Sequence, residues 1–247
     1  MEKVKLKVFR FNPSKERKGK YQFYEVPLTK GMTVLDSLLY IKEKLDHTLA
    51  LRYSCRMAIC GSCGMLINGF PRLACYTQIK ELNSKEITVE PLPNFPVLRD
   101  LVPDFKEFFE HHKRLKPYII RKEEERERGE YLQYPEELEK YLQFSLCIKC
   151  GLCYSACPVT ATDKLFPGPQ ALAQAYRYIA DSRDDGLKDR ISLVNEPHGI
   201  WRCHFAGSCS KVCPKGVDPA LGIQLLRRYL MSLSKPEKKL AKLFIKV

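Results

Sequence analysis

Apolar and polar residues alternate over residues 3–11, as they do in half-buried β-strands, and residues 21–27 form a second strand candidate. Thr33 and Asp36 then form a capping-box pattern that predicts a helix running to about residue 45. Asn68-Gly69 lies between two short apolar runs and predicts a tight hairpin. Several strands and one helix in about 95 residues predict a small α+β domain. The expected strands are residues 3–11, 21–27, 65–67, 72–74 and 86–90.

The second part of the chain changes to the 3.6-residue periodicity of amphipathic helices. Four prolines between residues 91 and 103 separate the two patterns, which predicts domains at 1–103 and 104–247. The chain is therefore expected to be α+β in its first domain and helical in its second. The expected helices are residues 135–146, 169–180, 218–231 and a terminal helix from 235 onward.

Charge patterning adds three expectations. The mixed-charge run at residues 122–130 predicts an exposed connector, and the run at 181–185 predicts a solvated helix end. The basic segment at 227–247 suits a membrane surface or an anchor subunit, or else an ordinary packing helix. The net charge of +13 raises nucleic-acid binding as a possibility, but zinc-finger spacing and interleaved basic and aromatic residues are missing. We expect no nucleic-acid partner.

The chain contains eleven cysteines, an odd number that excludes a fully paired disulfide framework. Its N-terminus alternates charged and apolar residues and does not read as a signal peptide. No stretch approaches the ~18–20 apolar residues that cross a bilayer. Clustered cysteines in a reducing compartment indicate metal or redox chemistry.

The first cysteine group has the spacing C-x4-C-x2-C, followed by eleven residues and a fourth cysteine. This is the plant-type ferredoxin pattern for a 2Fe-2S cluster. Structural zinc sites instead use two C-x2-C pairs far apart. The expected 2Fe-2S ligands are Cys55, Cys60, Cys63 and Cys75.

The second group has the bacterial ferredoxin spacing C-x2-C-x2-C-x3-C-P, in which the fourth cysteine binds the other of two clusters. A third group repeats this frame with Ala206 in the second position. A methyl group cannot bind iron, so the cluster at that site is expected to lack one iron. The expected 4Fe-4S ligands are Cys147, Cys150, Cys153 and Cys213, and the expected 3Fe-4S ligands are Cys157, Cys203 and Cys209. These three sets use all eleven cysteines.

These motifs resemble the iron–sulfur subunit of the succinate dehydrogenase/fumarate reductase family over nearly the whole chain. The resemblance implies a β-grasp plant-type ferredoxin domain followed by an α-helical bacterial-ferredoxin-like domain. It also implies an electron-transfer subunit of an oxidoreductase that links the tricarboxylic acid cycle to the respiratory chain. The stretches that carry it are 54–56, 60–65, 157–158, 181–184, 201–204 and 213–215.

The resemblance implies several partners. Substrate chemistry belongs to a flavoprotein subunit with covalent FAD, and membrane-anchor subunits hold the complex at the cytoplasmic face of the cell membrane. A quinone is expected beside the 3Fe-4S cluster, with Pro158, Val159, Trp201 and His204 as candidate contacts. No Gly-rich dinucleotide fingerprint follows a strand in this chain, which agrees with a flavin held elsewhere.

The resemblance departs at residues 159–162, where succinate:quinone reductases of the family carry tryptophans and this chain has Val-Thr-Ala-Thr. A fumarate-reductase branch, or a menaquinone-using or archaeal relative, fits equally well. The direction of the reaction stays open. The alternatives are a subunit of a thiol-linked fumarate reductase or heterodisulfide reductase-like complex, and a soluble multi-cluster ferredoxin.

Overall fold

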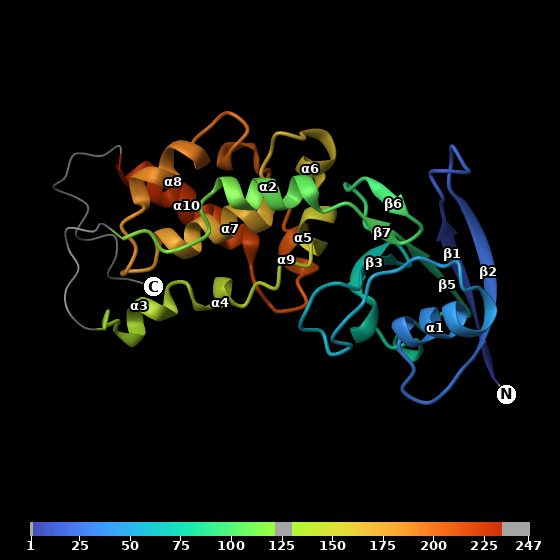
Figure 1. The fold of residues 1–247 in the computed structure, drawn as a ribbon. Helices are drawn as coiled ribbons and strands as arrows, with labels where there is room; N and C mark the ends of the chain where they lie inside the picture. Colours follow the sequence, from blue (N-terminus) through green and yellow to red (C-terminus); the bar gives the residue numbers. More distant parts are fainter. Residues whose placement is uncertain (1, 122–129, 234–247) are drawn as a thin grey trace. The chain divides into compact units, whose positions relative to one another are not determined.

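The alternating N-terminal segments pair as antiparallel strands in the computed structural model, which describes residues 2–121 and 130–233. The sheet of the first unit has the order β2-β1-β5-β3-β4 (Figure 1). β1 runs parallel to β5, and the other neighbouring strands are antiparallel. The strands are β1 (Lys3–Arg10), β2 (Lys20–Pro27), β3 (Gly64–Ile67), β4 (Phe70–Leu73) and β5 (Glu86–Glu90).

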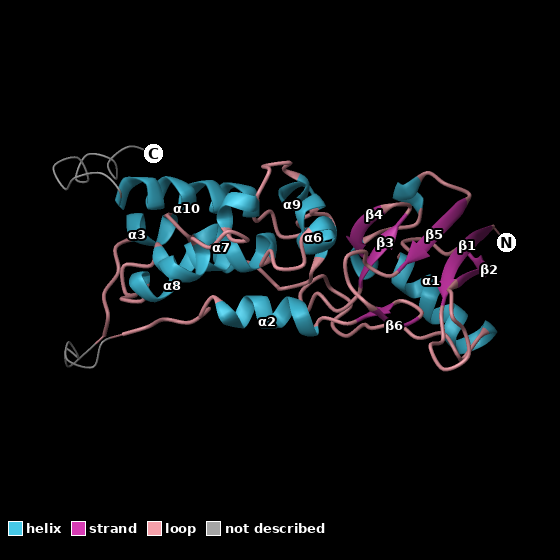
Figure 2. Cartoon of the chain, turned by 90° about the horizontal axis from the view of Figure 1, so that it is seen from above, coloured by secondary structure: helices cyan, strands magenta, loops and turns pink. Residues whose placement is uncertain are grey.

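Every second residue of β1 is buried, so its apolar face forms the centre of the core. Helix α1 (Val34–Tyr40) lies beside the sheet in both views (Figures 1 and 2). The predicted capping box is present, because Thr33 accepts from the Asp36 N–H and Asp36 accepts from the Thr33 N–H. A π-helical turn (Ile41–Leu45) follows, and the helical segment ends at the predicted residue.

The predicted hairpin is also present. Ile67 pairs with Phe70 across a two-residue turn, in which Asn68 and Gly69 have φ values of 48° and 75°. The second strand of the hairpin begins two residues earlier than the sequence indicated. Two short strands, β6 (Val97–Arg99) and β7 (Val102–Pro103), form a separate pair.

The contacts between residues divide the chain into two units. Of the described residues, the first unit contains 2–107, 148–156 and 212–215. The second contains 108–121, 130–147, 157–211 and 216–233. Two cysteine-bearing segments from the helical part of the sequence therefore belong to the first unit, with the sheet.

The second unit is built from helices around a buried apolar cluster that includes Phe166, Leu172, Ile223 and Leu226. Helices α7 and α10 pack side by side through this cluster (Figures 1 and 2). Its longer helices are α7 (Gly168–Ile179), α8 (Leu187–Val194) and α10 (Pro219–Leu233), with α2 (Lys106–Arg114) beginning at the end of the first unit. Its shorter helices are α3 (Pro135–Glu139), α4 (Leu142–Ser145), α6 (Pro158–Thr162) and α9 (Ser208–Lys211).

The helix predicted at 135–146 is wrong in one respect, because it is broken into α3 and α4. Tyr141 leaves helical geometry at φ −133° and buries its ring, with 1% of the residue exposed. Its hydroxyl donates to Gln133 Oε1 at 2.8 Å. The buried ring and its hydrogen bond stabilise the break between the two helices.

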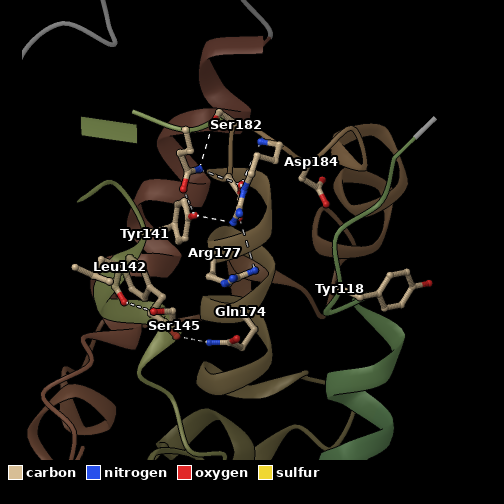
Figure 3. A network of polar contacts seen from close by, with 12 residues as sticks. Tyr118, Tyr141, Leu142, Ser145, Gln174, Arg177, Ser182 and Asp184 are labelled. Carbon is tan, nitrogen blue, oxygen red and sulfur yellow. Dashed lines mark hydrogen bonds and ion pairs between the residues drawn. The ribbon is translucent and has the colours of Figure 1, made fainter. Parts of the chain in front are cut away.

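The solvated helix end predicted at 181–185 is also wrong. The side chains of Asp181 and Asp184 are fully buried, and each carboxylate is paired with an arginine that offsets the cost of burying its charge. Asp181 accepts from Arg183, whose guanidinium also donates to the Tyr141 hydroxyl at 3.2 Å. Figure 3 shows Tyr141 within this network of polar contacts. Asp184 accepts two hydrogen bonds from Arg190, which is itself fully buried. These charges hold the second unit together instead of facing water.

Two expectations lie outside the described residues: most of the connector at 122–130 and the terminal helix from residue 235. Among the helices that the structure describes, none has the length and apolar character needed to cross a membrane.

Candidate functional site

The first cysteine group surrounds the start of the β3–β4 hairpin. Cys55, Cys60 and Cys63 lie in the loop before β3, and Cys75 lies in a short 3-10 helix (Ala74–Tyr76) after β4. The chain therefore brings a wrapping loop and a distant fourth cysteine to one end of the sheet. The structure places all four predicted 2Fe-2S ligands at this one position in the first unit.

Backbone N–H groups of this region point at the cysteine sulfurs. Such donors stabilise a thiolate and raise the reduction potential of a bound cluster. Six of these contacts are present, so the loop is arranged to hold negatively charged sulfur. The donors are the N–H groups of Cys55, Met57, Ala58, Ile59, Cys60 and Cys75, at 3.2–3.5 Å from sulfur.

Left-handed backbone turns explain how so many donors converge. Arg56, Ala58 and Gly61 have φ values of 57°, 58° and 73°. Alternation of this kind turns successive N–H groups toward one concave side, an arrangement that binds anions. Arg56 and Ala58 carry a β-carbon, so their conformation costs energy that a simple loop would avoid. The loop conformation fits a 2Fe-2S cluster.

The cysteine pKa values also reflect this grouping. Burial raises the pKa of Cys63 to about 12, and the nearby Cys75 and Cys60 thiols add to the rise. Burial acts in the same direction on Cys60, but backbone N–H groups of Cys55 and Ser62 outweigh it and lower its pKa to about 6. Cluster ligands bind as thiolates, so the lowered pKa of Cys60 favours such a role and the burial of Cys63 opposes its ionisation.

The second and third cysteine groups repeat each other at an offset of 56 residues. The repeat extends beyond the cysteines to the backbone. Lys149 and Phe205 have φ values of 55° and 56°, and Gly151 and Gly207 have values of 78° and 72°. The short helices α5 (Leu152–Ser155) and α9 (Ser208–Lys211) occupy matching positions.

This backbone repeat supports the alignment of Ala206 with Cys150. Both residues lie between the two left-handed positions of their own frame. The substitution of alanine for cysteine is therefore a change of side chain within one loop conformation.

Three cysteines and Ala206 line one hollow in the second unit: Cys157, Cys203 and Cys209. Burial raises the pKa of Cys209 to about 11, and the Cys157 and Cys203 thiols contribute to that rise. Burial raises the pKa of Cys157 as well, again with a contribution from Cys203. The Phe205 N–H donates to Cys203 sulfur at 3.4 Å. The residues predicted to bind a 3Fe-4S cluster are thus brought together around a common space.

The remaining four cysteines are divided between the units. Cys150, Cys153 and Cys213 belong to the first unit, while Cys147 ends a segment of the second. No disulfide joins any of the eleven cysteines, all of which lie in the described part of the chain. Within residues 2–121 and 130–233, no three His, Cys, Asp or Glu side chains converge as they would on a single metal ion.

The candidate quinone contacts separate into two groups. Pro158, Val159 and His204 line the same hollow as the three cysteines, but Trp201 does not. Trp201 is 46% exposed and donates from its indole nitrogen to Asn195 Oδ1 at 2.7 Å. His204 is exposed, so its ring is accessible to a ligand or a partner.

Two sets of contacts around Cys203 were not found from the sequence. Arg227, on α10, donates to the carbonyl oxygens of Ile200 and Cys203 at 2.7 and 2.6 Å. These hydrogen bonds fix the backbone that carries a proposed ligand. Arg227 is 27 positions from Ile200 and 24 positions from Cys203, and no local sequence signal connects it with either residue.

The second set joins Asp163 with His198 and Arg202, at 2.8 and 3.0 Å. The His198 hydrogen bond is the main cause that lowers the pKa of Asp163 to about 2, and Arg202 adds to it. Asp163 follows α6, which begins after Cys157, and Arg202 precedes Cys203. This ionic cluster therefore fixes the two segments that supply the hollow with cysteines.

Comparisons with known proteins find two family models along the chain. The family model of a 2Fe-2S iron-sulfur cluster binding domain matches residues 5–110. The model of a 4Fe-4S dicluster domain matches residues 143–217. A 2Fe-2S domain followed by a dicluster domain defines a multi-cluster electron-transfer protein.

The curated relatives identify the family. The fumarate reductase iron-sulfur subunit of Mycobacterium tuberculosis (strain CDC 1551 / Oshkosh) is 50% identical over 91% of both chains. The protein of the same name from Escherichia coli O6:H1 is 47% identical over 91% of both chains. A chain of the Mycobacterium smegmatis Sdh1 complex superimposes with a TM-score of 0.83 at 27% identity, covering 96% of this chain and 98% of that one.

The chain belongs to the family of iron–sulfur subunits of fumarate reductase and succinate dehydrogenase complexes. Within those complexes, this subunit is the electron-transfer part of an oxidoreductase. The predicted family, the fold class and the presence of 2Fe-2S and 4Fe-4S domains are confirmed.

Proposed function

We propose that this subunit carries electrons between the covalent FAD of a flavoprotein subunit and a membrane quinone, through 2Fe-2S, 4Fe-4S and 3Fe-4S clusters in series. The clusters supply reversible one-electron chemistry, and the chain fixes their positions and tunes their potentials. Membrane-anchor subunits hold it at the cytoplasmic face of the membrane. The proposed ligands are Cys55, Cys60, Cys63 and Cys75 for 2Fe-2S, Cys147, Cys150, Cys153 and Cys213 for 4Fe-4S, and Cys157, Cys203 and Cys209 for 3Fe-4S.

One observation carries this proposal furthest: the hollow that Cys157, Cys203, Cys209 and Ala206 line together. Its frame repeats the backbone of the preceding cysteine frame, so a thiolate would occupy the position of Ala206 in an ordinary 4Fe-4S site. Three thiolates and a methyl group suit a cubane that has lost one corner iron.

The quinone is proposed to bind beside this third cluster. His204 lies directly after a proposed ligand, is exposed and lines the hollow with Pro158 and Val159. Its imidazole can donate a hydrogen bond to a quinone carbonyl. The anchor subunits would complete this pocket. Trp201 is a weaker candidate, because it does not line the hollow.

We propose fumarate reduction by quinol as the physiological direction. Curated relatives named for fumarate reductase are 44–50% identical to the chain, whereas the chain of the Sdh1 complex is 27% identical. The ratio of quinol-driven fumarate reduction to quinone-linked succinate oxidation, measured on the membrane-bound complex, tests this direction. A complex that oxidises succinate much faster than it reduces fumarate would contradict it.

The wider proposal is tested by isolating the native complex from membranes under anaerobic conditions. We expect the chain to copurify with a flavoprotein that retains FAD after denaturation, and with at least one hydrophobic subunit. Oxidised samples should show the EPR signal of a 3Fe-4S cluster, and quinol should reduce it. Isolation of the chain without a flavoprotein would contradict the proposed complex.

A further inference from the structure

Gly61 makes an unusually close approach within the first unit. It lies between Cys60 and Cys63 in the proposed 2Fe-2S loop, with φ +73°. A β-carbon at this position would lie 2.8 Å from Cβ and 3.0 Å from Cα of Cys150. Ordinary contacts of such atoms begin at 3.4 Å, so the two backbones touch in a way that only glycine permits.

Gly64 repeats this contact one residue beyond the loop's last cysteine. Its added β-carbon would lie 3.3 Å from the Cys150 carbonyl oxygen and 3.2 Å from Leu152 Cδ2. Gly64 begins β3, and its φ is not positive. Its backbone conformation therefore does not require glycine. The remaining constraints are the nearby Cys150 segment and the Leu92 side chain, whose Cδ1 would lie 3.2 Å from the added β-carbon.

Cys150 is a proposed ligand of the 4Fe-4S cluster, and the glycines follow proposed 2Fe-2S ligands. We propose that Gly61 and Gly64 are positioning residues that hold the two cluster-binding loops in backbone contact, so that electrons cross between the clusters at the Gly61–Cys150 contact. This inference rests on the ligand sets of the proposed function. One electron passes along the route in either direction, and no bond is made or broken.

The physical reason is the steep decline of electron tunnelling with distance. From Cys60 sulfur, the route follows the chain to Gly61 and crosses a single van der Waals contact to Cys150, whose own sulfur binds the next cluster. A methyl group on Gly61 would push the loops apart by about 0.6 Å to reach ordinary contact. It would lengthen the route at its one non-covalent step.

Gly69→Ala is a matched control that separates the loss of the left-handed conformation of Gly61 from the loss of its close contact. Gly69 has φ +75°, close to that of Gly61, but nothing lies within 4 Å of its added β-carbon. Gly61→Ala and Gly69→Ala thus impose the same left-handed strain, and the first also separates the loops. Gly64→Ala avoids that strain, because the φ of Gly64 is not positive. It also separates the loops less, because the atoms around Gly64 include flexible leucine side chains that can move.

The three variants are compared with the wild type in the purified complex. Iron and acid-labile sulfide establish which clusters are present. Rapid freeze-quench EPR then measures the rate of electron transfer from the 2Fe-2S to the 4Fe-4S cluster. In fully reduced samples, the spin relaxation of the 2Fe-2S cluster reports its distance from the reduced 4Fe-4S cluster. Fold stability alone changes neither measurement.

We expect a several-fold slower transfer and weaker relaxation enhancement in Gly61→Ala, a smaller loss in Gly64→Ala and none in Gly69→Ala. Should Gly61→Ala assemble no 2Fe-2S cluster, Gly64→Ala decides alone. Wild-type rates and relaxation in every variant that holds both clusters would overturn the inference. An absence of both clusters from the wild-type complex would instead overturn the proposed function.

Discussion

Replacement of Ala206 with cysteine tests the assignment of the third cluster. Ala206 lies between two left-handed residues whose φ values match those around Cys150 within a few degrees. A cysteine side chain at position 206 would therefore extend from the backbone in the same direction as the side chain of Cys150, a proposed ligand of the four-iron cluster. We expect Ala206→Cys to restore a fourth thiolate and to convert the 3Fe-4S cluster into a 4Fe-4S cluster.

The expected change is one iron atom per chain, from about nine to about ten. The EPR signal of the oxidised three-iron cluster should fall from full intensity to almost none. The converted cluster should be harder to reduce, because cluster type and net charge set the potential. A lowering of the potential by ~59 mV shifts a one-electron equilibrium about tenfold, so a change of this size should reduce quinone-linked turnover by up to about tenfold.

The assay combines metal analysis and EPR on air-oxidised complex with quinone-linked and dye-linked activity. Dye-linked activity of the flavoprotein should persist, which separates a cluster effect from loss of the complex. Ala206→Val is the matched control, since valine adds volume without a donor atom and should leave the three-iron signal intact. Full three-iron intensity and about nine irons in Ala206→Cys would refute the alignment of the two frames.

Two further predictions follow from the structure. In the cluster-free chain, alkylation of Cys60 by iodoacetamide should increase with pH only to about pH 7, whereas alkylation of Cys209 should still be increasing near pH 10. The reason is that the reactive thiolate forms as the pH passes the pKa, which is about 6 for Cys60 and about 11 for Cys209. Peptide mass spectrometry measures the alkylated fraction at each cysteine. Arg190→Met should lower the free energy of unfolding by about 3–5 kcal/mol, because it leaves the buried Asp184 carboxylate unpaired. Urea unfolding followed by circular dichroism measures this loss, and a smaller loss in the double variant with Asp184→Asn checks its cause. Equal alkylation profiles at the two thiols, or an Arg190→Met variant as stable as wild type, would contradict them.

Local signals predicted much of the first unit. The bounds of β5, the Asn68-Gly69 turn and the Thr33 capping box all depend on residues close together in the sequence. The cysteine groups were recognisable for the same reason, because cluster ligands follow fixed local spacings.

The features of the fold that the sequence did not predict have a different physical origin. Helix α2 was not predicted from the sequence, because it is only nine residues long and buries only Phe108 and His112. Asp184 looked solvent-exposed because its partner, Arg190, cannot be identified from the sequence alone. These features are decided by tertiary contacts.

The same limit applies to the site. The cysteine spacings predicted three ligand sets, but nothing in the sequence indicated the hydrogen bonds from Arg227 to the Cys203 segment. It likewise gave no sign of the contact between Gly61 and Cys150, which are 89 positions apart. These contacts join residues far apart in the sequence, and local spacing does not reveal them.

The central claim is that this one chain holds three different clusters. Mössbauer and EPR spectroscopy of anaerobically purified, iron-57-labelled complex, with iron, sulfide and zinc analysis, tests it most directly. The account predicts about nine irons and ten sulfides per chain, divided among 2Fe-2S, 4Fe-4S and 3Fe-4S spectra. Stoichiometric zinc without iron, or a spectrum without a three-iron component, would contradict it.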